Sequence, residues 1–242
     1  MNHAVLEAVL EATWPPARSW MEGGFRLRDG AGGGKRVSAA TLEVDFAAAS
    51  VAQAGAEMNR HGGTALFRVR SSDQALDDTL ARRGYAIVDP TLFYTAPAQA
   101  LLNPGQAPLD AVTSETLLGI EAEIWAEGGI GPARTAVMER VAGPRAFLLA
   151  RLDDRAAGTG FVALHSGVAM VHALEVPPHK RRRGAARAML HRAAKWALAH
   201  GADSVALAVT ERNTPANSLY TGLGMKVAGR YHYREQPPGH AT

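Results

Sequence analysis

Two stretches of the chain follow the same order of strands and helices, and this repetition is the feature that most limits the possible folds. Each stretch has a strand ending in a Leu-Glu-Val tripeptide, "TLEV" at 41–44 and "ALEV" at 173–176. A helix follows each strand, and both helices end in similar tetrapeptides, "RHGG" and "AHGA". A chain of 242 residues is long enough for two small cores. We therefore predict two copies of one α/β unit, with chance similarity between two strand–helix–strand segments as the alternative.

The two copies differ in one place. The interval from the histidine to the later glycine is nearly the same in both, His61 to Gly84 and His200 to Gly224. The interval before the histidine is shorter in the first copy, and the shortfall falls where the second copy holds "PPHKRRRG". The second copy therefore carries a loop that the first lacks.

Hydrophobic periodicity and the positions of proline and glycine predict the elements of both copies. In the first half we expect two strands around a glycine-rich loop between residues 25 and 44, helices at 4–12, 46–60 and 73–83, and strands at 64–70 and 86–95. In the second half we expect helices near 114–126, 132–141, 184–200 and 215–223, and strands at 145–152, 158–165, 169–176, 204–209 and 226–234. The intervening residues carry prolines and little periodicity. The predicted domains are 1–97 and 114–242, joined by a linker at 98–113.

The glycine-rich loop "RDGAGGGKR" resembles a phosphate-binding loop in composition but does not fit its pattern. A P-loop needs glycine where Asp29 stands and serine or threonine where Arg36 stands. No helix clearly begins after Lys35. We therefore interpret this loop as a connection between two strands.

The cationic loop is the best candidate for a binding site. In "VPPHKRRRGAARAML" the strand must end at Pro177, because proline has no N–H to donate to the sheet. The chain then begins a helix at Gly184. The first N–H groups of a helix are unpaired and carry partial positive charge, so they attract phosphate. The alternative is a basic loop that is only solvated.

Two short motifs make the second half similar to the GNAT superfamily of N-acetyltransferases. Arg181-x-x-Gly184-x-Ala186 resembles that family's acetyl-CoA pyrophosphate loop. About one helix and one strand later, "NTPANSLYTGLGM" from Asn213 onward resembles its second signature. The resemblance covers roughly residues 110–242, and the first half resembles a degenerate copy without the phosphate loop. It implies an α/β (α+β) fold of tandem GNAT-like units, each a mixed, mostly antiparallel central sheet flanked by helices.

The resemblance also implies a set of residues that contact acetyl-CoA. The pantetheine arm would pair with the main chain of Leu174 and Val176, and the pyrophosphate would bind N–H groups at the start of the helix. Asn213 would contact the ligand or cap the following helix. The expected contacts are Leu174, Val176, Arg181, Arg182, Arg183, Gly184, Ala185, Ala186, Arg187, Asn213, Ala216 and Tyr220.

Candidate catalytic residues follow from the two proton transfers that acetyl transfer requires. Tyr220 matches the family position that often serves as general acid, and packing is its alternative role. For the base we weigh His172, Glu175 and a water molecule. Strand alternation predicts that His172 shares the face of Val176, whereas Glu175 points to the opposite face.

The expected function is acetyl-CoA-dependent N-acetyl transfer to a primary amine of a small molecule or peptide, by direct attack on the thioester. The alternative is a non-catalytic acyl-CoA-binding sensor or interaction protein. The net charge of +3 is small, and the cationic loop lacks interleaved aromatic residues, so we expect no nucleic-acid partner.

The remaining expectations come from composition. The chain has no cysteine, no apolar run of membrane-spanning length and no signal-peptide pattern, so we expect a cytoplasmic protein without a membrane partner. The histidines show no metal-ligand spacing, so we expect no metal. We expect a monomer or a homodimer.

Overall fold

The structure, a computed structural model, describes residues 2–102 and 110–237, and the chain forms two compact units. Unit 1 contains Met1–Pro15, Phe93–Val209 and Thr214–Ala228, and unit 2 contains Pro16–Leu92, Thr210–Asn213 and Gly229–Thr242. These bounds differ from the predicted division at residues 97 and 114. The N-terminal residues belong to unit 1, and strands β5 (Ala86–Pro97) and β11 (Lys226–Glu235) each contribute residues to both units.

Unit 1 is built on a mixed, mostly antiparallel sheet. Its strands lie in the order β6-β7-β8-β9-β10, with β5 on the far side of β10. Neighbours from β6 to β9 are antiparallel, and β9 and β10 are parallel. A parallel pair needs a crossover connection, which helix α6 (Ala185–Ala199) supplies. The strand bounds are β6 Ala111–Ser114, β7 Arg145–Leu152, β8 Arg155–His165, β9 Val168–Glu175 and β10 Ser204–Thr210.

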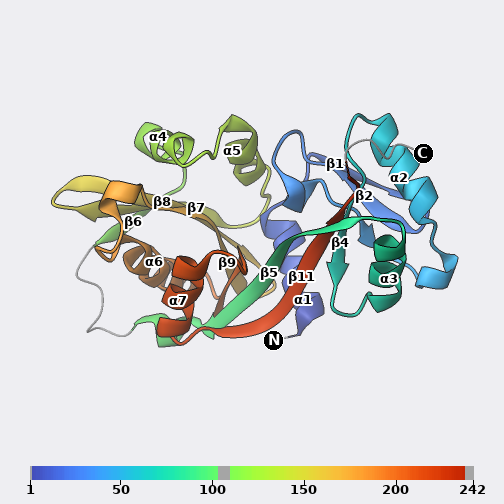
Figure 1. Ribbon diagram of the computed structural model, residues 1–242. Helices are drawn as coiled ribbons and strands as arrows, with labels where there is room; N and C mark the ends of the chain where they lie inside the picture. The colour runs from blue at the N-terminus through green and yellow to red at the C-terminus, as the bar shows by residue number, and fades with distance from the viewer. Residues whose placement is uncertain (1, 103–109, 238–242) are drawn as a thin grey trace. The chain divides into compact units, whose positions relative to one another are not determined.

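Helices cover both faces of this sheet. Helix α6 packs against β6, β7, β8 and β9 with an apolar stripe that includes Met189, Leu190 and Ala193. Helices α4 (Gly119–Glu127) and α5 (Pro132–Glu139) lie on the opposite side of β7 and β8 (Figure 1). Helix α7 (Thr214–Gly222) precedes β11. The core of unit 1 therefore consists of two apolar layers, one on each face of the sheet.

Helix α1 (His3–Thr13) completes the core of unit 1 although it begins the chain. It packs against β8 and β9, and Leu6, Val9 and Leu10 are almost completely buried. Asn2 caps the helix, because its side chain accepts a hydrogen bond from the N–H of Ala4 at 3.2 Å. Two prolines end the helix, as the sequence predicts.

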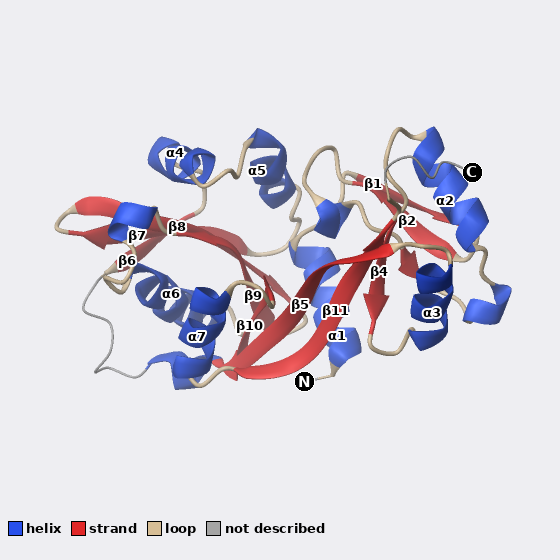
Figure 2. Cartoon of the chain, in the orientation of Figure 1, coloured by secondary structure: helices blue, strands red, loops and turns tan. Residues whose placement is uncertain are grey.

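Unit 2 has a second sheet with helices α2 (Val51–Arg60) and α3 (Gln74–Arg82) (Figure 2). Strands β1 (Arg18–Glu22), β2 (Phe25–Asp29) and β3 (Thr41–Leu42) are antiparallel neighbours. Strand β4 (Leu66–Arg70) lies beside this sheet, because Phe67 forms a single β-bridge with Ala40. On its other side β4 pairs with the later part of β11. Aromatic and aliphatic side chains from the strands and both helices form its core, among them Phe25, Leu27, Phe67, Leu76 and Leu80.

Several predicted bounds are corrected by the structure. Strand β1 was not predicted, and residues 46–48 form a short 3-10 helix before α2 begins at Val51. Ser50 sets that start, because its hydroxyl accepts a hydrogen bond from the N–H of Gln53. The helix expected from residue 114 begins at Gly119 instead, because residues 111–114 form β6 at the sheet edge. Of the predicted linker, residues 98–102 form a 3-10 helix and residues 103–109 lie outside the described residues.

The predicted fold class, a mixed and mostly antiparallel sheet flanked by helices, is confirmed. Across residues 2–102 and 110–237, no helix combines the length and apolar character that crossing a membrane would need.

Substitution of Leu6 tests the contribution of α1 to unit 1. Leu6→Ala should lower the free energy of unfolding by roughly 2–5 kcal/mol, because it leaves a cavity where a side chain with 0% exposure stood. Val5→Ala is the matched control, since Val5 is the neighbouring residue and is 38% exposed. Urea denaturation followed by circular dichroism measures both values. Equal losses for the two variants would contradict the placement of α1.

Candidate active site

A β-bulge in β9 determines the geometry of the candidate site. Phe161 of β8 pairs with His172, but Thr159, two residues away, pairs with Glu175, so β9 has one extra residue between the two pairs. Ala173 takes up this residue with a left-handed backbone, φ 48°. The indole N–H of Trp125 in α4 donates a hydrogen bond of 2.7 Å to the carbonyl of Ala173. The bulge is therefore held in place from the neighbouring helix.

The bulge corrects the predicted orientation of the two candidate bases. Regular alternation would place His172 and Glu175 on opposite faces of the sheet. Because Thr159 and Phe161 lie on one face of β8, their partners Glu175 and His172 also share one face. The predictions that Glu175 points away from the face of His172 and that His172 shares the face of Val176 are both wrong, because one inserted residue reverses the alternation.

His172 is part of the core beneath α1. Its ring is 2% exposed and stacks on Trp14 with centroids 4.9 Å apart. Its Nε2 lies 2.9 Å from the hydroxyl of Thr13, whose own proton is directed to the carbonyl of Val9 at 2.6 Å. His172 is therefore a packed core residue.

Glu175 lies at the partly open end of β9. Its side chain is 18% exposed, and Oε1 is 3.4 Å from the guanidinium of Arg181. Burial raises the pKa of Glu175 above its usual range, and the charge of Arg181 opposes that rise. Gly128 leaves room for this carboxylate, because a Cβ there would lie 2.7 Å from Cγ and Cδ of Glu175.

Two of the predicted cations anchor the loop between β9 and α6. After Val176 the chain forms a short 3-10 helix, Pro178–Lys180. The ammonium of Lys180 donates to the carbonyl of Ala156 at 2.6 Å, and Nε of Arg181 donates to the carbonyl of Val176 at 2.8 Å. The loop is thus tied to the ends of β8 and β9.

The start of α6 requires a glycine. Gly184 has φ 93° and Arg182 has φ 64°, so the chain turns sharply before the helix begins. The helical ladder starts with the N–H of Ala188, which donates to the carbonyl of Gly184 at 2.9 Å. Arg183 pairs with Asp153 at 3.1 Å in an exposed ion pair. Ala185, Ala186 and Arg187 form the first turn of the helix, where N–H groups precede the ladder.

The strand residues predicted to hold the ligand's arm lie where β9 ends. Leu174 packs across β8, because a Cβ on Gly160 would lie 2.9 Å from its Cδ1. Val176 likewise packs over Gly158, at 3.0 Å from a Cβ built there. Gly160 and Gly158 carry no side chain, so they leave room on β8 for the side chains of Leu174 and Val176.

The second signature divides between the two units. Asn213 belongs to unit 2, and its N–H donates to the carbonyl of Thr210 at 3.0 Å. Ala216 lies in the first turn of α7 in unit 1. Tyr220, also in α7, is 6% exposed and its ring is 5.5 Å from that of Tyr94. Burial, with a smaller contribution from Tyr94, raises the pKa of Tyr220 to about 12.

Sequence reasoning missed three residues that shape this site. Trp125 fixes the bulge, Gly128 admits Glu175, and Trp14 covers His172. The Gly128-Gly129 pair after a predicted helix was a usable signal for close packing, whereas nothing local marks Trp125. Among residues 2–102 and 110–237, no three histidine, aspartate or glutamate side chains come together as metal ligands.

Replacing the glycine before α6 tests whether the left-handed turn is required. Gly184→Ala should lower the free energy of unfolding by about 1–2 kcal/mol, because a Cβ is disfavoured at φ 93°. In the control Gly222→Ala, a Cβ meets nothing within 4 Å, so stability should be unchanged or higher by about 0.5–1 kcal/mol. Thermal unfolding of both variants gives the comparison, and a neutral Gly184→Ala would contradict the turn.

Comparison with known proteins gives a family match for part of the chain and a fold match for the whole of it. Residues 120–225 match the model of the acetyltransferase (GNAT) family. A search among curated proteins found no match. Among solved structures, a GCN5-related N-acetyltransferase from Kribbella flavida is 18% identical, with a TM-score of 0.70 over 100% of this chain and 98% of that one.

Two further solved structures are similar over most of the chain. A tandem GNAT protein from the clavulanic acid biosynthesis pathway is 18% identical, with a TM-score of 0.62 over 97% of this chain and 88% of that one. A functionally unknown protein from Staphylococcus epidermidis is 11% identical, with a TM-score of 0.63 over 93% of this chain and 96% of that one. At these identities the likeness is one of fold. Residues 120–225 therefore match the acetyltransferase (GNAT) family, and the chain as a whole has the fold of GNAT proteins, a tandem one included.

Proposed function

We propose that unit 1 transfers an acetyl group from acetyl-CoA to a primary amine of a small molecule or peptide. The observation that carries this proposal is the bulge in β9, which brings the carboxylate of Glu175 to the end of the sheet where the loop to α6 begins. The carboxylate of Glu175, a proton acceptor, then lies at one end of the sheet. A few residues further along the chain α6 begins, and its start suits a phosphate group.

The start of α6 suits the pyrophosphate of the acyl donor. The N–H groups of the first turn, which precede the helical ladder, and the dipole of a 15-residue helix attract an anion, and left-handed Gly184 lets it approach the backbone closely. Arg182, Arg183 and Arg187 add positive charge. Arg181, an expected contact of the ligand, instead donates to the carbonyl of Val176. Lys180, for which the sequence predicted no role, also holds the loop, through the carbonyl of Ala156 in β8.

The strand end suits the thioester arm. In the proposed complex, main-chain groups of Leu174 and Val176 pair with the pantetheine amides, and an N–H beside the bulge stabilises the oxyanion that develops on the thioester carbonyl. Holding amine and thioester in attack geometry contributes up to about 7–11 kcal/mol in favourable cases.

Glu175 is the proposed base. The amine nitrogen attacks the carbonyl carbon, a C–N bond forms and the C–S bond breaks, so one proton must leave nitrogen and one must reach sulfur. This count is for the neutral amine. A lysine-type amine has a pKa near 10 and is mostly protonated at neutral pH, so it must lose a further proton before it attacks. The raised pKa of Glu175 makes its carboxylate a stronger base than an exposed glutamate. His172 fits this role less well, because Thr13 and Trp14 cover it.

Tyr220 is the proposed donor to the leaving sulfur. With a pKa of about 12 its hydroxyl stays protonated at neutral pH. A thiol has a pKa near 8.5, so complete proton transfer from Tyr220 to the thiolate is uphill. The tyrosine would therefore stabilise the thiolate mainly by donating a hydrogen bond. Glu127 adds a second negative charge near Glu175, which favours a cationic amine as acceptor.

Ligand binding is the first experiment, because it separates binding from catalysis. Acetyl-CoA or CoA at one hundred times its dissociation constant should stabilise the protein by roughly 2.7 kcal/mol in a thermal-shift titration. Gly184→Glu should abolish the shift. Binding without thiol release for any amine in a broad panel would favour the non-catalytic acyl-CoA-binding alternative. No shift with either ligand would refute the assignment of the loop.

Substitution of Glu175 tests the base. Glu175→Gln should lower kcat/KM by about 100- to 10,000-fold, because glutamine cannot accept the proton. The wild-type rate should fall as the pH falls through the raised pKa of Glu175, since only the carboxylate form is active. This acid limb should be missing in Glu175→Gln. Thiol release measured across pH gives the profile, and Glu123→Gln, an exposed position in α4, is the control.

Substitution of Tyr220 tests the donor. Tyr220→Phe keeps the ring that packs near Tyr94 and removes only the hydroxyl. We expect kcat to fall by about 100-fold or more while the affinity for CoA is unchanged. Steady-state kinetics and CoA titration measure the two effects separately. An unchanged kcat would assign Tyr220 to packing alone.

A further inference from the structure

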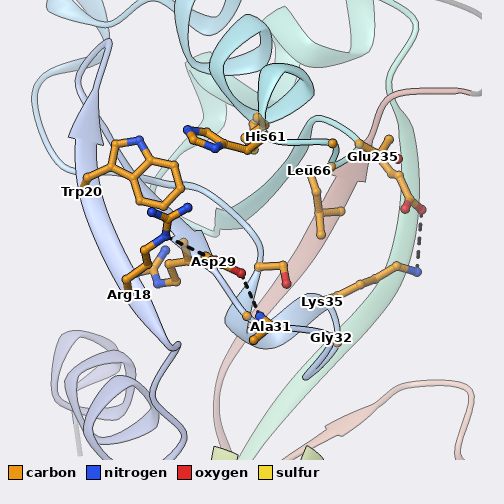
Figure 3. A pocket seen from close by; sticks show the side chains of 17 residues that line it. Arg18, Trp20, Asp29, Ala31, Gly32, Lys35, His61, Leu66 and Glu235 are labelled. Carbon is orange, nitrogen blue, oxygen red and sulfur yellow. Dashed lines mark hydrogen bonds and ion pairs between the residues drawn. The ribbon is translucent and has the colours of Figure 1, made fainter. Parts of the chain in front are cut away.

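Unit 2 contains a cavity of about 450 Å³ that none of the preceding assignments uses. Arg18 and Trp20 of β1 line one side, and Lys35 and Glu235 line the other (Figure 3). The glycine-rich loop after β2 lies along it, and its volume lies within the range of small-molecule sites. Every lining residue belongs to unit 2.

The glycine-rich loop has one defined conformation. The N–H of Ala31 donates to the carboxylate of Asp29 at 2.9 Å, and Ala31 itself has φ 47°, which is unusual for a residue with a Cβ. Gly32 and Gly34 also have left-handed backbones, φ 79° and 93°. A Cβ on Gly30 would lie 2.5 Å from the hydroxyl of Ser38. The loop therefore packs closely against Ser38, and at its glycines the backbone itself lines the cavity.

Arg18 supplies a cation whose donors are only partly used. Its guanidinium lies 5.2 Å over the ring of Trp20, and its Nε donates to Asp29 at 3.2 Å. Its side chain is 60% exposed, and within the described part of the chain its terminal nitrogens make no other hydrogen bond. His61 lies edge-on to Trp20 at 5.2 Å, which helps to fix the ring that supports Arg18.

More cations than carboxylates line the cavity, and Arg18 is the cation that an anion can reach most easily. Three permanent cations line it, Arg18, Arg28 and Lys35, against two carboxylates, Asp29 and Glu235. Lys35 is compensated by Asp89 at 3.1 Å and Glu235 at 3.6 Å. The pair of Arg18 and Asp29 is largely exposed, and such pairs contribute little free energy, so an anionic ligand can compete for Arg18.

We propose that this cavity binds a small organic anion, with a carboxylate or phosphate group held by the guanidinium of Arg18 and by N–H groups of the glycine-rich loop. A guanidinium binds either group through two parallel hydrogen bonds. In the loop, the N–H of Ala31 already donates to Asp29 and that of Gly33 to the carbonyl of Gly30 at 2.9 Å, so the N–H groups of Gly32 and Gly34 are those assigned to the ligand. The proposal does not depend on acetyl transfer in unit 1.

Trp20 is a reporter built into the cavity. The chain has four tryptophans, so the full-length protein labelled with 15N gives four indole N–H signals, and Trp20→Phe identifies the one that belongs to Trp20. Inorganic phosphate and succinate are the probes, each titrated against sodium chloride at equal ionic strength. We expect the Trp20 signal to shift and saturate while those of Trp125 and Trp196 stay in place. A response to phosphate alone indicates a phosphate-bearing ligand, and a response to succinate alone a carboxylate.

The variant Arg18→Gln decides whether the anion binds where we propose. It should weaken probe binding by about tenfold, because it removes a charged hydrogen-bond donor. Arg26→Gln is the matched control, since Arg26 lies in the same unit, pairs with Glu43 at 3.7 Å and does not line the cavity. It should leave binding unchanged. The dispersed indole signals check that each variant is folded. A Trp20 signal that never saturates with either probe, or equal weakening by both variants, would overturn the proposal.

Discussion

The hydrogen bond from the indole of Trp125 to the carbonyl of Ala173 is the interaction on which the candidate active site depends. It holds one extra residue in β9, and that residue decides which face of the sheet receives Glu175. Without the bulge, regular alternation would direct this carboxylate to the α6 side of the sheet. A core contact between helix and strand thus sets the position of an ionisable group two residues further along the strand.

The basic residues after β9 serve two different purposes, which their spacing alone does not distinguish. Lys180 and Arg181 donate to main-chain carbonyls of β8 and β9, so they fix the loop. Arg183 faces solvent in a weak exposed pair and can exchange its partner for a ligand. Carbonyl groups at the ends of β8 and β9 accept hydrogen bonds from Lys180 and Arg181 and not from Arg183, and the sequence does not show which cations lie close to these carbonyls.

Much of the fold could be predicted because proline, glycine and apolar periodicity act locally. Pro177 ends β9, Gly184 begins α6, and the strands at 145–176 and 204–210 lie close to their predicted bounds. The bulge could not be predicted, since Ala173 carries no signal for a left-handed backbone. Nor could the burial of His172, because it depends on α1, which is distant in the sequence.

The division of β5 and β11 between the units has a consequence for how the chain is made. Unit 2 includes residues from Gly229 onward, so β4 lacks its partner strand until β11 has been made, although most of the unit is made first. Unit 1 in turn draws on the first fifteen residues. In many proteins the N-terminal domain folds completely before the next domain emerges from the ribosome. This protein cannot fold in that order, because each unit contains residues from the early and the late part of the chain. Both units contain residues of β11, so neither can be completed before this strand has been made, and long-range strand pairing will slow that step.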